Sequence, residues 1–409
     1  MNLNFVIIKL SKVLILLLPL AVLGIAAFSC VPASSGGGCA GPGAQGWSGL
    51  TGYNGILYFG SMDGKVLALD PSARSRGLSF PSEMEWSYTI KAPVPPGSIC
   101  GPACAPAAPG VKIYGTLAAA EELVYVGTYN GKVMAMNRSA PGYDEEGNPS
   151  WIEKGEWFYP RGETKFIGAI VGSPVVAGDA VYVGDSEGTI YALDAVSGNK
   201  RWEFETGGRI WTSPAVSDGV VYVGNYDGSL YALSSGGGSQ LWKFESPAAI
   251  ASSPVVSGSN VFFGTFDRYL YAIGSADGEE RWRFEGENWF WASSLVKDNV
   301  VYAGCLDHKI YALEVRTGKE LWQFVTDSPI VSTPVLVDNL LVVVSQSGET
   351  YILEADSGAL ERTVSIGYSV MAPLYAGGNM VYIHARDRYV YAIDVQNGEI
   401  AWRFSSDIE

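Results

Sequence analysis

Short apolar runs separated by turn-forming residues fill most of the chain after residue 47. Within residues 213–245 four such runs follow one another, at Pro214–Val216, Val220–Val223, Leu230–Leu233 and Leu241–Phe244. Each run is bounded by Gly, Asp, Ser or Asn, and the runs show no 3.6-residue period. This pattern predicts short antiparallel β-strands and excludes a helical repeat.

The four-run unit recurs every 40 residues, and the recurrence is clearest at a tyrosine in the third run and a tryptophan in the fourth. The tyrosines are Tyr191, Tyr231, Tyr271, Tyr311, Tyr351 and Tyr391. The tryptophans are Trp202, Trp242, Trp282, Trp322 and Trp402, and Arg362 stands at the one position that lacks the tryptophan. Four strands in about 40 residues is the size of one propeller blade.

Two earlier units match the same pattern but are longer. Ile56–Gly60 with Val66–Asp70, and Val124–Gly127 with Val133–Asn137, correspond to the second and third runs. Units therefore begin near residues 47, 111, 168, 212, 252, 292, 332 and 372. The sequence predicts an all-β fold for residues 47–409, an eight-bladed β-propeller with four antiparallel strands in each blade.

Each unit also carries all or part of the motif Ala-x-Asp-x-x-x-Gly-x-x-x-Trp. The full form occurs at Ala192, Asp194, Gly198 and Trp202, and again at Ala392, Asp394, Gly398 and Trp402. In this motif the chain resembles the quinoprotein (PQQ-type) propellers. The resemblance implies that the tryptophans pack between neighbouring blades, where a backbone carbonyl can accept the indole N–H. We therefore expect Trp202, Trp242, Trp282, Trp322 and Trp402 to be largely buried docking residues.

The N-terminus has the pattern of an export signal. Lys9 and Lys12 precede the apolar run Val13–Phe28, which has the length of a signal-peptide core. We expect a signal peptide over residues 1–29, with an uncleaved anchor as the alternative. Residues 27–30 suit an ordinary signal peptidase and also resemble a lipobox, in which Cys30 would be lipidated. Residues 30–46 are rich in Gly, Ser and Pro and read as a flexible tether to the membrane.

Cysteine and histidine usage gives little support to a cofactor. Quinone-dependent dehydrogenases of this fold need Ca²⁺, a catalytic Asp and usually two adjacent cysteines, and no two cysteines are adjacent here. His308 and His384 lie 76 residues apart, so no metal-spaced pair exists. Cys100 and Cys104 share a Pro/Gly-rich loop, where we expect a disulfide, with two separate thiols or a metal-binding pair as the alternatives. We expect no PQQ, no calcium or other metal, and no catalytic residue.

Two sets of residues recur near the predicted turns. Acids or amides occupy one turn position at Asp63, Asn130, Glu187, Asp227, Asp267, Asp307 and Asp387. They can stabilise the turns by accepting backbone hydrogen bonds, or form an acidic ring that binds cations. Aromatic residues enter the innermost strands at Trp211, Trp289, Phe290, Trp291 and Tyr368. They either plug the central channel as core or form a binding face at its mouth.

The formal net charge of −15 argues against nucleic acid as a partner. Together, the repeat and the leader resemble the BamB-type lipoproteins of outer-membrane protein assembly. That resemblance implies a non-enzymatic, exported, membrane-tethered and monomeric scaffold that binds a protein partner in the cell envelope. A quinone-dependent dehydrogenase and a propeller that senses a small ligand are the alternatives.

Overall fold

The computed structural model describes residues 48–61, 63–82, 84–90, 111–139, 142–143, 149–150, 156–162 and 165–408. These residues belong to the compact unit Gln45–Glu409. The expected signal peptide, the tether, Cys30, Cys100 and Cys104 lie outside the described residues, so their assignments stay predictions. No helix in the described ranges is long and apolar enough to cross a membrane.

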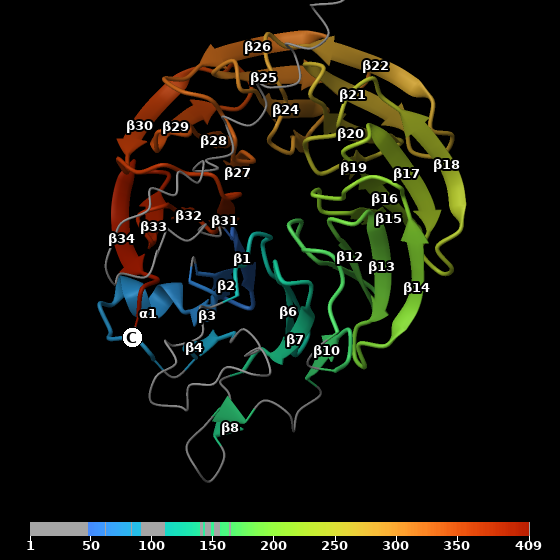
Figure 1. Cartoon of the computed structure of the whole chain (residues 1–409). Coiled ribbons are helices and arrows are strands. Elements are labelled where there is room, and N and C mark those ends of the chain that lie inside the picture. Colours follow the sequence, from blue (N-terminus) through green and yellow to red (C-terminus); the bar gives the residue numbers. More distant parts are fainter. Residues whose placement is uncertain are drawn as a thin grey trace, which may run out of the picture. The chain divides into compact units, whose positions relative to one another are not determined.

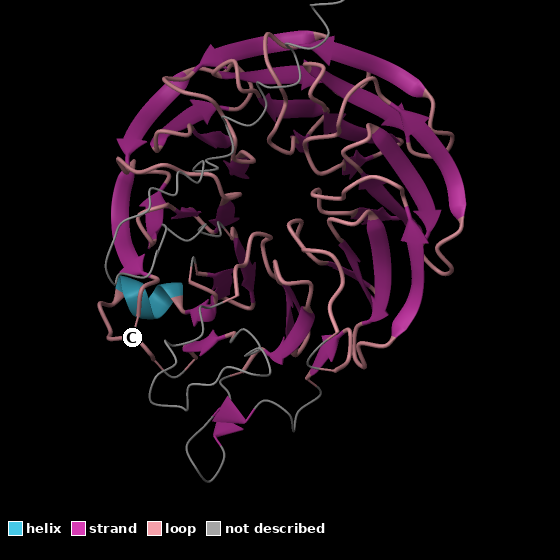
Figure 2. Cartoon of the chain, viewed as in Figure 1, coloured by secondary structure: helices cyan, strands magenta, loops and turns pink. Residues whose placement is uncertain are grey.

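Eight four-stranded antiparallel sheets follow one another along the chain (Figures 1 and 2). Blade 1 comprises β1 (Leu50–Tyr53), β2 (Ile56–Gly60), β3 (Lys65–Leu69) and β4 (Trp86–Thr89), with the short helix α1 (Pro71–Ser75) between β3 and β4. Blade 2 comprises β5 (Ala118–Ala120), β6 (Leu123–Gly127), β7 (Val133–Asn137) and β10 (Trp157–Tyr159), and the small hairpin β8 (Gly142–Tyr143) and β9 (Pro149–Ser150) lies in its insertion.

The remaining six blades are nearly identical in length. Blade 3 has β11 (Val175–Ala177), β12 (Ala180–Gly184), β13 (Thr189–Asp194) and β14 (Lys200–Glu205); blade 4 has β15 (Ala215–Ser217), β16 (Val220–Gly224), β17 (Ser229–Ser234) and β18 (Gln240–Glu245). Blade 5 has β19 (Val255–Ser257), β20 (Asn260–Gly264), β21 (Tyr269–Gly274) and β22 (Glu280–Glu285); blade 6 has β23 (Leu295–Lys297), β24 (Val300–Gly304), β25 (Lys309–Glu314) and β26 (Glu320–Val325). Blade 7 has β27 (Val335–Val337), β28 (Leu340–Val344), β29 (Glu349–Glu354) and β30 (Leu360–Ser365); blade 8 has β31 (Tyr375–Gly377), β32 (Met380–His384), β33 (Tyr389–Asp394) and β34 (Glu399–Ser405). The predicted eight-bladed propeller is confirmed.

Hydrogen bonds from tryptophan tie blades 3, 4, 5 and 6 each to the following blade. The indole Nε1 of Trp202 donates to the carbonyl of Ser235 at 2.8 Å, and that of Trp242 donates to Ser275 at 3.0 Å. Trp282 and Trp322 donate in the same way to Val315 and Ala355. Trp202 and Trp282 are buried as predicted, whereas Trp242, Trp322 and Trp402 are only half-buried.

The glycine of the motif is required by the same contact. Gly238 has a φ of +70°, and a Cβ atom there would lie 2.6 Å from the ring of Trp202. Gly198 has a φ of +67° and stands in the same way against Trp157, the tryptophan of blade 2. Only glycine combines this backbone conformation with room for the neighbouring indole.

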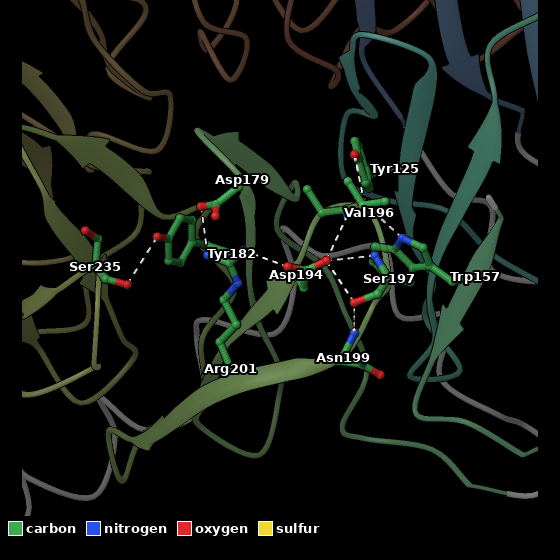
Figure 3. A network of polar contacts seen from close by, with 11 residues as sticks. Tyr125, Trp157, Asp179, Tyr182, Asp194, Val196, Ser197, Asn199, Arg201 and Ser235 are labelled. Atoms are coloured by element: carbon green, nitrogen blue, oxygen red, sulfur yellow. Dashed lines mark hydrogen bonds and ion pairs between the residues drawn. The ribbon is translucent and has the colours of Figure 1, made fainter.

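The acid of the motif holds the turn that presents the accepting carbonyl (Figure 3). Asp194 accepts hydrogen bonds from the backbone N–H and the hydroxyl of Ser197, both at 2.8 Å, and pairs with Arg201 at 2.7 Å. These contacts, led by the Arg201 hydrogen bond, hold the pKa of Asp194 well below its usual value. Beyond this turn, the carbonyl of Ala195 accepts both the Trp157 indole at 2.9 Å and the Tyr125 hydroxyl at 3.2 Å.

Side chains, and not a shared strand, close the ring between blades 8 and 1. All four strands of blade 1 come from one continuous segment, as in blade 8. A core cluster joins Leu57 and Phe59 to Val390 and Phe404. His384 fills packing space at this junction, as the sequence suggested. It is 3% exposed, its Nδ1 lies 2.9 Å from the carbonyl of Ser48, and burial lowers its pKa.

Within the part of the chain that the structure describes, the tryptophan hydrogen bond is missing at the junction between blades 8 and 1, which we call the seam. The Nε1 of Trp402 has no hydrogen-bond partner among the described residues, whereas four of its counterparts donate to the following blade. In blade 1 the position of the accepting carbonyl is Pro71, the first residue of α1. That carbonyl accepts the hydroxyl of Ser75 within the helix.

Candidate binding face

The segments that enter the innermost strands lie on the same side of the propeller as the turns between the second and third strands. Backbone hydrogen bonds join the two in each compact blade. The N–H of Tyr226 donates to the carbonyl of Arg209 at 2.9 Å, and that of Leu306 to Trp289 at 2.9 Å. We call this side, made of the entry segments and these turns, the entry face. That these two sets of segments lie on one side agrees with the antiparallel strands predicted from the sequence.

Phe290 is a core residue, so its assignment to a binding face was wrong. It is 0% exposed, and its ring packs against Phe284 and Tyr311 at centroid distances of 6.4 and 6.0 Å. A Cβ atom on Gly264 would lie 2.4 Å from the Phe290 side chain. The equivalent residues of other blades are also fully buried, namely Ile210, Ile250, Ile330 and Val370. Alignment at the 40-residue period would have identified the position as core.

The three tryptophans predicted in the entry segments, Trp211, Trp289 and Trp291, belong to a continuous aromatic group across blades 4, 5 and 6. We call this group the aromatic strip, and it consists of Trp211, Tyr226, Phe266, Trp289 and Trp291. Trp211 and Tyr226 have ring centroids 4.7 Å apart, and Tyr226 meets Phe266 edge-on at 5.7 Å. Phe266 then contacts Trp289 at 4.5 Å and stacks on Trp291 at 5.7 Å. All five side chains are half-buried, so each keeps part of its surface accessible.

Tyr226 and Phe266 were missed by the sequence analysis, because their turn was read only for its acid. Each residue directly precedes that acid, in the pairs Tyr226–Asp227 and Phe266–Asp267. The same position holds Ser186, Leu306, Gln346 and Arg386 in the other compact blades. Among the compact blades, the aromatic residue at this position in two neighbouring blades was the available signal; blade 2 has Tyr129 there as well.

Tyr368 lies apart from the aromatic strip, although it is on the entry face. Its side chain is 51% exposed, and within the described residues it makes no ring contact. The predicted set therefore divides into three strip members, one core residue and one isolated exposed tyrosine.

The aromatic strip is uncharged and bordered by ion pairs. Burial raises the pKa of Tyr226, so its hydroxyl stays protonated at neutral pH. Arg268 pairs with Glu285 at 3.1 Å beside Phe266 in the sequence, and Lys309 pairs with Glu287 at 2.6 Å beside Trp289. The Nε1 of Trp211 is buried and has no hydrogen-bond partner among the described residues. An apolar centre with a charged rim is the general form of a protein-binding surface.

In blades 5, 6 and 8 the turn acid itself stabilises the turn, whereas in blades 3 and 4 the turn N–H groups donate to Asp185 and Asn225, two positions before Glu187 and Asp227. Asp267 accepts the hydroxyl of Tyr271 at 2.8 Å and the N–H of Tyr269 at 3.2 Å. Asp307 similarly accepts from Tyr311 and from the N–H of Lys309. Turn stabilisation, the first of the two readings of these acids, is what their hydrogen bonds show. Over the described ranges, no group of three or more His, Cys, Asp or Glu residues is placed to hold a metal ion.

Cys305, which the sequence left unassigned, is a buried thiol behind the aromatic strip. Its Sγ lies 3.2 Å from the carbonyl of Asn288, and burial raises the pKa of the thiol to about 12. A thiol with so high a pKa is protonated at neutral pH and is a poor nucleophile. The residue therefore acts as a small apolar core side chain.

Comparisons with known proteins agree with the fold. A crystal structure of BamB from Moraxella catarrhalis aligns with a TM-score of 0.62 and 18% identity, over 84% of this chain and 92% of that one. A computationally designed protein, Ika8, aligns with a TM-score of 0.65 and 19% identity, over 85% of this chain and 96% of that one. At such low identities these structures show the fold alone. No curated protein sequence matches the chain at a significant level.

A comparison with sequence models of protein families identifies the family as well as the fold. The sequence model of the family described as outer membrane protein assembly factor BamB matches residues 63–208, 141–253, 227–335 and 307–409. Together these overlapping matches run from residue 63 to residue 409, so they cover the third and fourth strands of blade 1 and all of blades 2 to 8. They confirm the PQQ-like repeats recognised in the sequence. The chain therefore belongs to the BamB-type family of PQQ-like repeat propellers.

Proposed function

We propose that this protein is a non-enzymatic scaffold of the cell envelope that binds a protein partner through the aromatic strip. The family supports a role in outer-membrane protein assembly, because its description names an assembly factor. The observation that carries the proposal is the continuous contact of Trp211, Tyr226, Phe266, Trp289 and Trp291. Tryptophan and tyrosine dominate the binding energy of protein interfaces when they lie at the centre of a contact.

Membrane tethering is the second part of the proposal, and it rests on the leader. Export followed by lipidation of Cys30 would place the propeller at a membrane surface outside the cytoplasm. Mass spectrometry of the native N-terminus tests this directly. A mature chain that starts at a lipid-modified Cys30 is expected. An unmodified Cys30 in a soluble product would reject tethering, and retention of Val13–Phe28 would reject cleavage.

A matched pair of variants tests the aromatic strip. Double replacement of Trp289 and Trp291 by alanine should abolish cross-linking of the full chain to its partner in solubilised membranes. Tyr368→Ala removes an exposed aromatic from the same face but outside the strip, and it should leave the cross-linked product unchanged. Thermal unfolding of both variants establishes that they are folded. Equal cross-linking by the double variant and the wild type would refute the proposed site.

The quinone-dependent alternative is tested by ligand stabilisation. A ligand that binds the native state adds RT ln(1 + [L]/Kd) to stability, about 2.7 kcal/mol at a hundredfold excess over Kd. We expect PQQ with Ca²⁺ to leave the melting temperature unchanged and to give no dehydrogenase activity. A saturable rise in melting temperature would favour the quinone enzyme over the scaffold.

A further inference from the structure

The fourth strand of every blade is the outer edge of its sheet. Such an edge can pair with a strand of another chain, and proteins commonly protect it with charged side chains. In the part of the chain that the structure describes, β26 of blade 6 pairs only with β25. Its outer edge is therefore available for pairing.

Four of the compact blades carry a charge at the middle of this edge. Each charged residue lies opposite the tyrosine of the third strand and is exposed, and the four are Glu203, Lys243, Arg283 and Arg403. In β26 the same position is Gln323, opposite Tyr311. Blade 7 has Thr363 there, opposite Tyr351, but Glu361 and Arg362 precede it on the same strand.

The β26 edge is also apolar on both sides of Gln323. Leu321 is 51% exposed and Val325 is 62% exposed. The alternate residues Trp322 and Phe324 turn toward blade 7, where they contact Ala355 and Tyr351. The outward side chains of β26 thus form an uncharged sequence, Leu-Gln-Val, that no other compact blade presents.

We propose that the chain is not the monomer expected from the family resemblance, and that β26 pairs antiparallel with the same strand of a second copy of this chain, about a twofold axis at Gln323. In this register Leu321 lies opposite Val325 of the partner subunit, and Gln323 lies opposite its own copy. Apolar pairs directly opposite each other stabilise a sheet, whereas like charges there destabilise it. The same register in β18 or β22 would oppose Lys243 or Arg283 to its own copy.

The self-complementary side chains are the reason for choosing a second copy as the occupant. A twofold interface uses the same patch on both subunits, so it requires a patch that is complementary to itself. A bulge between Ala312 and Leu313 leaves Leu321 as the extra residue of β26, which limits regular pairing to a short stretch. A contact of this size gives a weak dimer that depends on concentration.

Sedimentation velocity of the full chain in detergent, over a concentration series, measures this dimer. Gln323→Lys should raise the dimer dissociation constant about fivefold or more, because it opposes two like charges at the axis. Thr363→Lys places the same charge at the equivalent position of blade 7 and should leave the dimer intact. All variants should retain the wild-type melting temperature, because both positions are exposed.

Charge complementation distinguishes this register from every other arrangement. Gln323→Glu alone should weaken the dimer as the lysine variant does. An equimolar mixture of Gln323→Glu and Gln323→Lys should restore it, because Glu then lies opposite Lys at the axis. A wild-type chain that stays monomeric would overturn the proposal. So would a mixture that stays monomeric, or a Thr363→Lys variant as impaired as Gln323→Lys.

Discussion

At the scale of single residues, blades 3 to 6 are each fixed to the next blade by one indole, one carbonyl and one glycine. Trp242 illustrates the set, because its Nε1 donates to Ser275 at 3.0 Å and its ring lies against Gly278. The sequence motif names the tryptophan and the glycine but not the carbonyl. The accepting residue varies among Ser235, Ser275, Val315 and Ala355, because only its backbone takes part.

Replacing Trp242 by alanine should lower the free energy of unfolding by about 3 kcal/mol, the lower end for large aromatic truncations, since the ring is half-buried. Trp242→Phe keeps a ring but removes the N–H, and it should cost about 1 kcal/mol from the lost hydrogen bond plus a packing change. Chemical denaturation of the three chains measures both differences. A loss below about 1 kcal/mol for the alanine variant would argue against docking.

The glycine contact can be separated from the glycine backbone conformation. Gly238→Ala combines a positive φ with a clash against Trp202, whereas Gly258→Ala has a similar φ of +57° and nothing within 4 Å of the new Cβ. Both variants should bear the backbone cost of about 1 kcal/mol. Gly238→Ala should cost a further 1–3 kcal/mol, roughly, from overpacking. Equal losses of unfolding free energy in the two variants, measured with denaturant, would show that the Trp202 ring moves aside at no cost.

At the scale of the elements, blade 7 differs from the other compact blades because Arg362 occupies the position of the tryptophan. The absence of the tryptophan does not disturb the strand pairing of this blade. β29 and β30 keep the register and the bulge of their counterparts, because backbone hydrogen bonds and not the tryptophan set the pairing. The missing indole shows instead in exposure, since Arg362 is exposed where the tryptophans of the counterpart strands are buried or half-buried.

Restoring the tryptophan should stabilise blade 7. Gly398 of blade 8 already leaves the space that an indole would use, because a Cβ there would lie 2.6 Å from the Arg362 side chain. Arg362→Trp should therefore raise the free energy of unfolding by about 1 kcal/mol, as cavity-filling changes commonly do. Trp322→Arg, the reverse change in blade 6, should lower it. A destabilised Arg362→Trp variant would show that the space is not preformed.

The strands and blades were easier to predict from the sequence than the contacts between blades. Strand order, blade number and the docking tryptophans followed from the 40-residue period, because every blade repeats the same contacts. The aromatic strip was only partly foreseen. Trp211, Trp289 and Trp291 were recognised as entry-segment aromatics, but Phe290 was misplaced and Tyr226 and Phe266 were overlooked. Their contacts join different blades, so no pattern within one repeat reveals them.

At the scale of the whole molecule, the seam between blades 8 and 1 is the position where the repeats differ most. His384 stands where the second strand of blades 1 to 6 ends in glycine, and burial lowers its pKa from the ordinary value. Its buried Nε2 has no hydrogen-bond partner among the described residues, and the hydrogen bond with the Ser48 backbone and the charge of Asp387 oppose the lowering of the pKa without reversing it. The ring therefore closes around a neutral imidazole.

This neutral imidazole predicts a pH dependence of stability. Unfolded histidine binds a proton below about pH 6.5, whereas buried His384 resists it, so the unfolded state binds more protons. The contribution is complete above pH 6.5 and falls as the pH drops below that value, by at most about 1.4 kcal/mol per pH unit. Urea unfolding of the wild type and of His384→Gln between pH 7.5 and 5 isolates the effect. Parallel profiles for the two chains would rule out this role.

Because side chains close the ring, the chain could start at any blade and still build the same propeller. Because each blade is one continuous segment and none lends a strand to another, the ring can be cut between any two blades. A circularly permuted chain that starts with blade 4 and ends with blade 3 should build the same propeller. It needs only a linker from β34 to β1 about as long as residues 246–254, which join β18 to β19. By the same logic, whole blades can be duplicated, exchanged or moved in the gene without interrupting a sheet.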